Sequence, residues 1–407
     1  MRILLITPRL PYPPYRGDKL KIFNLLKRLA PGHSIHLVSF IEKKSELEHL
    51  QQLSPYCAAI DVVPLRRWQS YWKCLIGLLS PLPLQVHYFK SRRMRRLLAE
   101  ICSQQHFDVI HTHLIRMAPY TAALRHTAKV LDLTDAVSLY LQRYLAREKN
   151  PLLKFLLKLE LMRIRRYESV VEQFNTCFVC SEPDREQLRQ AAPEADIRLI
   201  PNGVDLAYFS GAATAYEPNR IVFTGNLTYH PNIDGIFYFV NEIFPLIKKE
   251  VPAAKFYIVG QSPSAKIRAL AGDDVIVTGF VEDIKQYYLS SAVAVSPIRF
   301  GAGTLNKILE PLALGVPVVA TSIGIEGLDL TIGKDILVAD RPHAFAKHVV
   351  HVLKDAEFRH RVGHAGMAMV RRLYNWDTIV GLLDKIYREL SSATAALRYS
   401  KQWTSVE

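Results

Sequence analysis

Residues 291–320 read SAVAVSPIRFGAGTLNKILEPLALGVPVVA, and this stretch decides the fold. Ala292–Ser296 is an apolar run of strand length, and Val316–Ala320 is a second. Between them the pattern predicts a glycine-bearing loop, then a helix that begins near Leu305 and ends at Gly315. Two apolar strands joined by a helix make a βαβ unit, so the stretch predicts a parallel sheet.

The same alternation of short apolar runs and helical patterns extends along the rest of the chain. It predicts an α/β fold made of two Rossmann-like, doubly wound parallel-sheet domains. The expected strands of the first series are Arg2–Thr7, Ser34–Phe40, Val109–His113, Val130–Leu133, Phe178–Cys180 and Arg198–Ile200. Those of the second are Ile221–Thr224, Lys255–Val259, Val275–Thr278, Ala292–Ser296, Val316–Ala320 and Ile336–Val338.

The length of 407 residues suits two domains of roughly 200 residues each. Turn residues in Pro201-Asn-Gly-Val-Asp205 mark the boundary between the two strand series. We therefore expect domains at 1–200 and 201–375. A last amphipathic helix at 376–393 is expected to cross back to the first domain, and a polar tail fills 394–407.

Composition restricts the classes of protein and of partner. Hydrophobic residues make up 49% of the chain and charged residues 22%, as in globular proteins. No run reaches the roughly 20 apolar residues of a membrane-spanning helix, and the N-terminal run is too short for a signal peptide, so we expect a cytoplasmic protein. The net charge of +14 favours anionic ligands, nucleic acid or an anionic membrane as partners.

Five cysteines do not form a recognisable metal or disulfide pattern. Cys177 and Cys180 form a CxxC, but no second pair stands at a zinc-ligand spacing, and both lie in an apolar run of strand type. We interpret them as core residues.

Specific motifs give the chain a resemblance to the GT-B glycosyltransferases, especially the retaining family 4 enzymes. The matches run in family order from Met1 to about Leu390, and the C-terminal half carries the more specific ones. They are Pro201-Asn-Gly-Val-Asp205, Phe223-Thr-Gly-Asn-Leu-Thr-Tyr-His-Pro-Asn-Ile-Asp-Gly235, Phe256-Tyr-Ile-Val-Gly260 and Gly301–Ala320, with Pro11–Asp18 and Asp108–His113 in the first half.

The resemblance implies a GT-B fold whose domains face a central cleft, with an acceptor-binding first domain and a nucleotide-sugar-binding second domain. It implies transfer of a hexose-type sugar to a glycan or lipid-linked acceptor with retention of configuration and no metal cofactor. The nearest likeness is to sugar transferases of bacterial exopolysaccharide clusters. Two alternatives stay open, a sugar-nucleotide epimerase and a non-catalytic binding protein on the same fold.

The loop at Gly301 carries the expected donor site. A glycine-bearing loop at a helix start exposes backbone N–H groups that favour anions, and Thr304 is a candidate N-cap. Arg299 and Lys307 place cations at the edges of the loop, where they would stabilise the leaving diphosphate. By resemblance, Glu310 binds the ribose hydroxyls, because a carboxylate accepts two hydrogen bonds. Donor contacts are expected from Gly301, Gly303, Thr304 and Leu305.

The chain departs from the family pattern at two places. Ala302 stands where many members have a first glutamate that contacts the transferred sugar. The loop after Thr224 lacks the usual arginine and lysine, and carries Asn226 and His230 as polar substitutes. His230 is either a phosphate contact or a surface turn residue.

The first domain supplies the remaining candidates. The loop from Pro8 to Asp18 is too long for a dinucleotide fingerprint, but Gly17 and Asp18 precede a helix, and Arg9 and Arg16 add positive charge. By resemblance this loop reaches the donor phosphate through Gly17 and the acceptor through Arg16 and Asp18. A capped helix start without ligand contact is the alternative.

Two histidines and two aspartates end neighbouring strands of the first domain. His111 and His113 share a strand face, and the resemblance places His113 near the sugar as a catalytic residue; a structural histidine is the alternative. Asp132 and Asp135 either touch the acceptor or cap the next helix. An H-x-H pair can bind metal, but no third ligand is near in sequence, so we expect no metal site.

Two basic and aromatic stretches favour peripheral association with an anionic membrane, at the inner face of the cytoplasmic membrane. Arg66–Arg96 contains eight Lys or Arg and no Asp or Glu, with interleaved Trp and Tyr, and Leu152–Arg166 mixes leucines with cations. Solvated helices that pack on the sheet are the plain alternative. Nucleic-acid binding is not expected, because no such motif is present.

Overall fold

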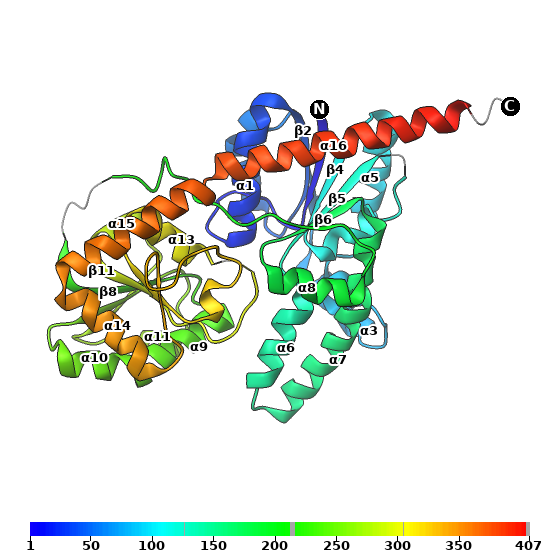
Figure 1. Cartoon of the computed structure of the whole chain (residues 1–407). Helices are drawn as coiled ribbons and strands as arrows, with labels where there is room; N and C mark the ends of the chain where they lie inside the picture. Colours follow the sequence, from blue (N-terminus) through cyan, green and yellow to red (C-terminus); the bar gives the residue numbers. More distant parts are fainter. Residues whose placement is uncertain (126, 212–215, 304, 404–407) are drawn as a thin grey trace. The chain divides into compact units, whose positions relative to one another are not determined.

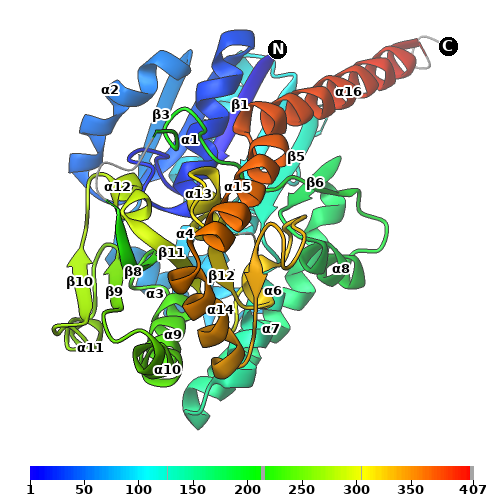
Figure 2. The same ribbon diagram turned by 60° about the vertical axis from the view of Figure 1, so that its left-hand side comes forward.

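The computed structural model describes residues 1–125, 127–211, 216–303 and 305–403, and the chain divides into two units. The N-terminal unit consists of residues 1–200 together with the chain from Ile379 onward, and the C-terminal unit of Pro201–Thr378. Each unit is a parallel sheet with helices (Figures 1 and 2).

The N-terminal unit is built on a seven-stranded sheet in the order β3-β2-β1-β4-β5-β6-β7, and all of its pairs are parallel. The strands are β1 (Arg2–Thr7), β2 (Ser34–Ile41), β3 (Ala59–Pro64), β4 (Val109–His113), β5 (Ala128–Thr134), β6 (Thr176–Val179) and β7 (Ile197–Leu199). The helices are α1 (Gly17–Leu29), α2 (Leu50–Leu53), α3 (Arg67–Gly77), α4 (Leu84–Phe89), α5 (Arg92–Gln104), α6 (Val137–Arg147), α7 (Pro151–Tyr167) and α8 (Glu182–Ala191).

The C-terminal unit repeats this architecture with a six-stranded parallel sheet in the order β10-β9-β8-β11-β12-β13. Its strands are β8 (Glu217–Thr224), β9 (Lys255–Val259), β10 (Val275–Gly279), β11 (Ser291–Ser296), β12 (Val318–Ala320) and β13 (Leu337–Val338). Its helices are α9 (His230–Tyr238), α10 (Phe244–Glu250), α11 (Ala265–Arg268), α12 (Ile284–Leu289), α13 (Asn306–Ala313), α14 (Pro342–Lys354) and α15 (Ala356–Leu373). A last helix, α16 (Trp376–Trp403), begins in this unit and continues into the other.

Strand β8 shows why its residues lie in the centre of a sheet. Ile221 and Phe223 pack into one hydrophobic cluster, whereas Val222, between them, packs into another. Side chains alternate across a strand, so helices on both faces require apolar residues at every position. This confirms the predicted α/β doubly wound class.

Helix α13 ends with a glycine cap that sets the direction of the next strand. Gly315 has φ of +75°, its N–H donates to the Leu312 carbonyl, and the N–H of Val316 donates to the Pro311 carbonyl. This is the Schellman pattern, which favours glycine because L side chains strain that conformation. The cap leads the chain into β12.

Two features differ from the sequence prediction. Strand β3 was not predicted, because Asp61 and Pro64 interrupt its apolar pattern, which an edge strand tolerates. Helix α16 continues to Trp403, so residues 394–403 are helical rather than a polar tail. Residues 391–403 contain good helix formers and neither glycine nor proline, which allows the helix to propagate.

No described helix is long and apolar enough to cross a membrane.

Candidate functional site

The candidate site of the C-terminal unit lies where β8 and β11 end. These two strands are neighbours in the sheet, and the strand order reverses direction between them. Ligands of open α/β sheets bind at such a switch point, outside the carboxyl ends of the strands. The loop from Gly225 to Tyr229 follows β8, and the loop from Pro297 to Leu305 follows β11 and leads into α13.

Glu310 on α13 is held by a buried tyrosine. The Tyr288 hydroxyl donates to Glu310 Oε2 over 2.9 Å and lies 2.5 Å from Thr224 Oγ1. Since the single tyrosine proton goes to the carboxylate, the threonine hydroxyl is the donor in the second bond. Thr224 and Tyr288 thus fix one oxygen of Glu310 and leave the other for a ligand.

Lys307, one turn before Glu310, is the cation of this site. Its ammonium donates to Asn232 Oδ1 and lies 4.5 Å from the centre of the Phe223 ring. A side chain added at Gly225 would meet Lys307 Nζ at 3.1 Å, so the ammonium lies against the turn after β8. One donor is engaged by Asn232, which leaves two for an anion.

The charges of Lys307 and Glu310 are poised near neutral pH. Burial lowers the pKa of Lys307 to about 7, and the nearby Glu310 opposes this only in part. Burial likewise raises the pKa of Glu310 to about 7, against the Tyr288 hydrogen bond and the charge of Lys307. Both charged forms would gain from a ligand that supplies an anion to the lysine and hydroxyl donors to the glutamate.

Arg299 is engaged by a carboxylate of α9. Its Nε donates to Asp234 Oδ2 over 2.8 Å and its NH2 to Asp234 Oδ1 over 2.6 Å, a bidentate pair. The guanidinium also lies 4.4 Å from the centre of the Tyr238 ring. In this state Arg299 ties the loop after β11 to α9, and its predicted contact with a diphosphate stays a prediction.

The loops carry the other predicted donor contacts. Gly301 and Gly303 have φ of +156° and +74°, conformations that favour glycine, and Leu305 is the last residue before α13. Thr304 lies outside the described residues. Asn226 accepts bonds from the backbone N–H and hydroxyl of Thr228, while His230 is exposed at the start of α9.

In the N-terminal unit, Gly17 and Asp18 begin α1 as expected, and Arg16 precedes them. Gly17 is exposed with open space around it, whereas Asp18 pairs with Arg9 over 3.2 Å and with Arg16 over 3.5 Å. Burial opposes ionisation of Asp18, but Arg16 and Arg9 outweigh it and lower its pKa. Asp18 and His113 line a common small pocket.

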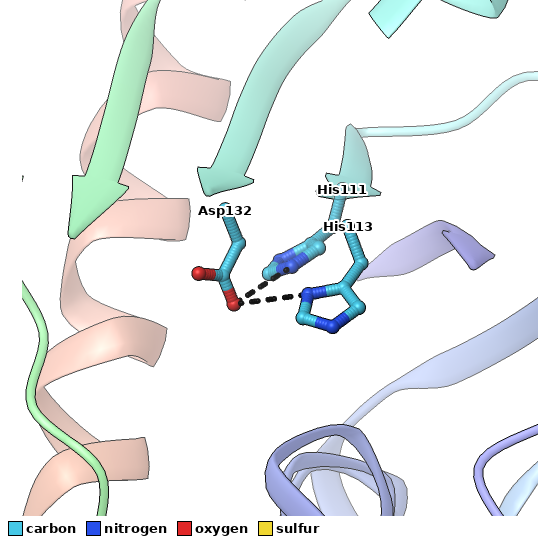
Figure 3. A group of neighbouring side chains, drawn as sticks. All are labelled: His111, His113 and Asp132. Atoms are coloured by element: carbon cyan, nitrogen blue, oxygen red, sulfur yellow. Dashed lines mark ion pairs between the residues drawn. The ribbon is translucent and has the colours of Figure 1, made fainter. Parts of the chain in front are cut away.

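His111 and His113 converge on Asp132 at the ends of β4 and β5 (Figure 3). His111 Nε2 and His113 Nδ1 each lie 3.6 Å from Asp132 Oδ2. The other oxygen, Oδ1, accepts from Lys21 Nζ over 2.7 Å, and both residues of this pair are 1% exposed. Burial opposes the charge of Asp132, but Lys21 and the imidazoles hold its pKa well below the usual range.

The group His111, His113 and Asp132 supplies the third ligand that the sequence did not show, since its ligand atoms lie within 4.8 Å of one another. Two imidazoles and a carboxylate suit a transition metal. The Lys21 ammonium, however, already balances the Asp132 carboxylate, so a divalent cation would leave excess positive charge in a buried place. The arrangement fits an orienting network for His113 better than a metal site.

Asp135 and the two strand cysteines complete the predicted residues of this unit. Burial, with help from Asp184, raises the pKa of Asp135 to about 7. Cys177 and Cys180 are buried thiols, which confirms their interpretation as core residues.

Comparisons with known proteins agree with this architecture. Residues 22–208 match the family Glycosyltransferase Family 4, and residues 218–355 match Glycosyl transferases group 1. An uncharacterized 44.6 kDa protein from the cps region of Klebsiella pneumoniae is 22% identical over 390 residues, which cover 92% of this chain and 96% of that protein.

Solved structures share the fold. Sucrose-phosphate synthase from Thermosynechococcus elongatus aligns with a TM-score of 0.72 at 19% identity, over 97% of this chain and all of that one. The Anabaena protein HepE in complex with UDP-glucose aligns with a TM-score of 0.66 at 14% identity, over 96% of this chain and all of that one. These likenesses confirm the predicted GT-B fold.

The buried pair of Lys21 and Asp132 gives the first testable prediction. Lys21→Met leaves a buried carboxylate without its cation, and we expect it to lower the free energy of unfolding by roughly 3–5 kcal/mol. Urea denaturation followed by circular dichroism measures this. The double variant Lys21→Met/Asp132→Asn removes both charges and should recover much of the loss; a double variant as unstable as the single one would trace the loss to packing instead.

Proposed function

This chain belongs to the group 1 and family 4 glycosyltransferases, and we propose that it transfers a sugar from a nucleotide-sugar donor to a glycan or lipid-linked sugar acceptor. The observation that carries the donor assignment is the arrangement around Glu310. One carboxylate oxygen is fixed by Tyr288 and the other is left for a ligand, while Lys307 on the same helix faces the turn after β8. A nucleoside diphosphate presents both complements, ribose hydroxyls and a pyrophosphate.

In this proposal the ribose hydroxyls donate to Glu310, and the diphosphate contacts Lys307 and backbone N–H groups of the Gly301–Leu305 loop. Their positive charge stabilises the negative charge that develops on the leaving diphosphate. Arg299 keeps the loop against α9 through Asp234, and would reach the diphosphate only by leaving that carboxylate. UDP is the first nucleotide to test, because HepE is solved with UDP and with UDP-glucose.

We further propose that the transfer retains the anomeric configuration, needs no metal ion and serves exopolysaccharide synthesis. The relative from a cps region supports the last point. The cation at Lys307 supports the second, because it places positive charge where metal-dependent enzymes use an ion.

Nucleotide binding tests the donor site. Calorimetric titration with UDP, GDP and ADP should show micromolar binding of one nucleotide, equal in EDTA and in Mg²⁺. Glu310→Ala should weaken that binding by roughly 10- to 100-fold, since it removes hydrogen bonds to a charged acceptor. Glu357→Gln, which changes an exposed carboxylate on α15, is the matched control.

Failure of all three nucleotides to bind would refute the donor site. Binding without transfer to any acceptor would leave a non-catalytic binding protein.

The pKa values of Lys307 and Glu310, both about 7, predict a bell-shaped pH dependence of nucleotide-sugar affinity. Lys307 loses its positive charge as pH rises through about 7, and Glu310 loses its negative charge as pH falls through about 7. Affinity should therefore peak near neutral pH. Lys307→Met should flatten the alkaline limb and Glu310→Gln the acid limb. An affinity that is flat between pH 6 and 8 (roughly one unit to either side of these values) would contradict this assignment of charges.

The acceptor side of the proposal involves a membrane, and one surface of the N-terminal unit supports it. Helix α3, the turn after it and helix α7 form this surface, which we call the α3–α7 surface (Figures 1 and 2). The Leu84 N–H donates to Glu160 Oε1 over 2.7 Å, and Arg163 donates to the Leu78 carbonyl, so the two stretches predicted from the sequence are joined.

Large apolar side chains stand exposed on the α3–α7 surface. Leu79 is 98% exposed and Ile76 is 75% exposed. Single exposed apolar residues are common on proteins, but a group of them on one surface indicates an interaction site. The others are Trp68, Tyr71, Trp72, Leu75, Leu78, Leu152, Leu153, Phe155, Leu156 and Met162. Exposed cations accompany them at Arg66, Lys154, Lys158, Arg165 and Arg166. Aromatic and basic residues around an apolar centre fit the anionic inner face of the cytoplasmic membrane.

Vesicle sedimentation tests this surface. The protein should bind vesicles that contain phosphatidylglycerol, bind pure phosphatidylcholine weakly, and lose binding at high salt. The triple variant Trp72→Ser/Ile76→Ser/Leu79→Ser should weaken binding at least tenfold, whereas Leu47→Ser, at an exposed leucine elsewhere in the unit, should not. Equal binding by the triple variant would assign the surface to another partner, and so would a wild-type protein that is dimeric in solution when the triple variant is monomeric.

A further inference from the structure

Arg116, which has no ion-pair partner in the described part of the chain, marks a second charged site at the switch point of the N-terminal sheet. Arg9 follows β1, and Arg116 lies in the short 3₁₀ helix Ile115–Tyr120 that follows β4. These strands are neighbours, and the strand order reverses between them. The position is equivalent to that of the Glu310 site in the other sheet.

The two guanidinium groups share one aromatic ring. Arg9 Cζ lies 5.8 Å from the centre of the Phe89 ring and Arg116 Cζ lies 5.5 Å from it. Phe89 is 2% exposed, so the ring is a fixed platform for both. Two like charges on one ring repel each other, and a cation–π contact does not neutralise them.

The carboxylates nearby do not balance this charge. Asp18 is taken by Arg9 and Arg16, at 3.2 and 3.5 Å. Asp135 acts on Arg116 electrostatically, but its pKa of about 7 leaves it only partly charged at neutral pH. Among the described residues Arg116 has no ion-pair partner, and its Nε is buried without a hydrogen bond.

This arrangement disfavours the charged form of Arg116, as its lowered pKa indicates. Burial, assisted by Arg9, lowers its pKa to about 10, even though Asp18 and Asp135 act in the opposite direction. Folding therefore desolvates a cation that no carboxylate of the described residues contacts as an ion pair. Buried charges are normally paired, and an unpaired one is a candidate for ligand binding.

We propose that Arg116, with Arg9, binds an oxyanion of the acceptor, a phosphate or a carboxylate. This inference rests on the proposed function, because it takes the N-terminal unit as the acceptor side. A guanidinium offers a fork of donors that matches phosphate and carboxylate oxygens in a bidentate manner. Arg9 lies against Asp18 and His113, and Arg116 acts electrostatically on Asp18, so the anion would bind near this group of residues.

Calorimetry with inorganic phosphate and with glucuronate, in saturating amounts of the nucleotide that the protein binds, tests the site. With the donor site filled, one equivalent of at least one probe should bind, and the stronger probe tells phosphate from carboxylate. Arg116→Gln should weaken this binding at least tenfold and leave nucleotide affinity unchanged. Arg116→Lys should restore it in part, and Arg189→Gln, at an exposed arginine of α8, should have no effect.

Thermal unfolding provides a second readout that a folding defect cannot imitate. Without added anion Arg116→Gln should melt at or above the wild-type temperature, because it removes an unpaired cation. The wild-type melting temperature should rise with the probe, and that of the variant should not.

Equal anion binding by wild type and Arg116→Gln would overturn the inference. If nucleotide abolishes binding of the probe, the anion site belongs to the donor site, which would also contradict the inference. In both cases intact nucleotide binding would leave the proposed function standing.

Discussion

The order of parallel strands is the constraint on which both candidate sites depend. In each sheet the first strand lies beside the fourth, so the loops after these two strands diverge and leave room between them. In the C-terminal unit this room is bordered by Gly225 and by the loop before α13; in the N-terminal unit it is bordered by Arg9 and His113. Neither set of residues is close in sequence, and only the crossover of the chain brings them to one edge.

The C-terminal site combines a rigid part with an electrostatically adaptable part. The buried Tyr288 hydroxyl holds Glu310 through a hydrogen bond and is itself bonded to the buried Thr224, while Arg299 and Asp234 neutralise each other at the border. Lys307 and Glu310 are instead desolvated enough that each loses charge near pH 7. A ligand that carries a diphosphate and vicinal hydroxyls would restore both charges. The ionisation that is unfavourable in the free protein is thereby coupled to binding.

Sequence reasoning predicted the parts of this picture that depend on local signals. The apolar runs gave twelve strand positions because buried parallel strands are continuously apolar, and Glu310 and Lys307 were identified within one continuous motif. The contacts that sequence reasoning did not predict join residues that are far apart in the chain. Tyr288 lies 64 residues from Thr224, Arg299 lies 65 from Asp234, and Lys21 lies 111 from Asp132. No local pattern reports such contacts, and a lysine at 21 in an amphipathic helix has the same sequence signal whether it is solvated or buried.

Lys21 and Arg116 of the N-terminal unit show how a structural charge is told from a functional one. Lys21 lies on α1, after β1, and Arg116 lies in the 3₁₀ helix after β4. Desolvation opposes both charges, but Lys21 has Asp132 at 2.7 Å, whereas Arg116 has no carboxylate within ion-pair distance among the described residues. A paired charge costs its desolvation and regains most of it from its partner, so Lys21 is explained by the fold alone. In the free protein Arg116 is desolvated, and no ion-pair partner among the described residues offsets this. An external anion is the partner that would account for it. Arg116 and His113 both act electrostatically on Asp18, so such an anion would bind near His113.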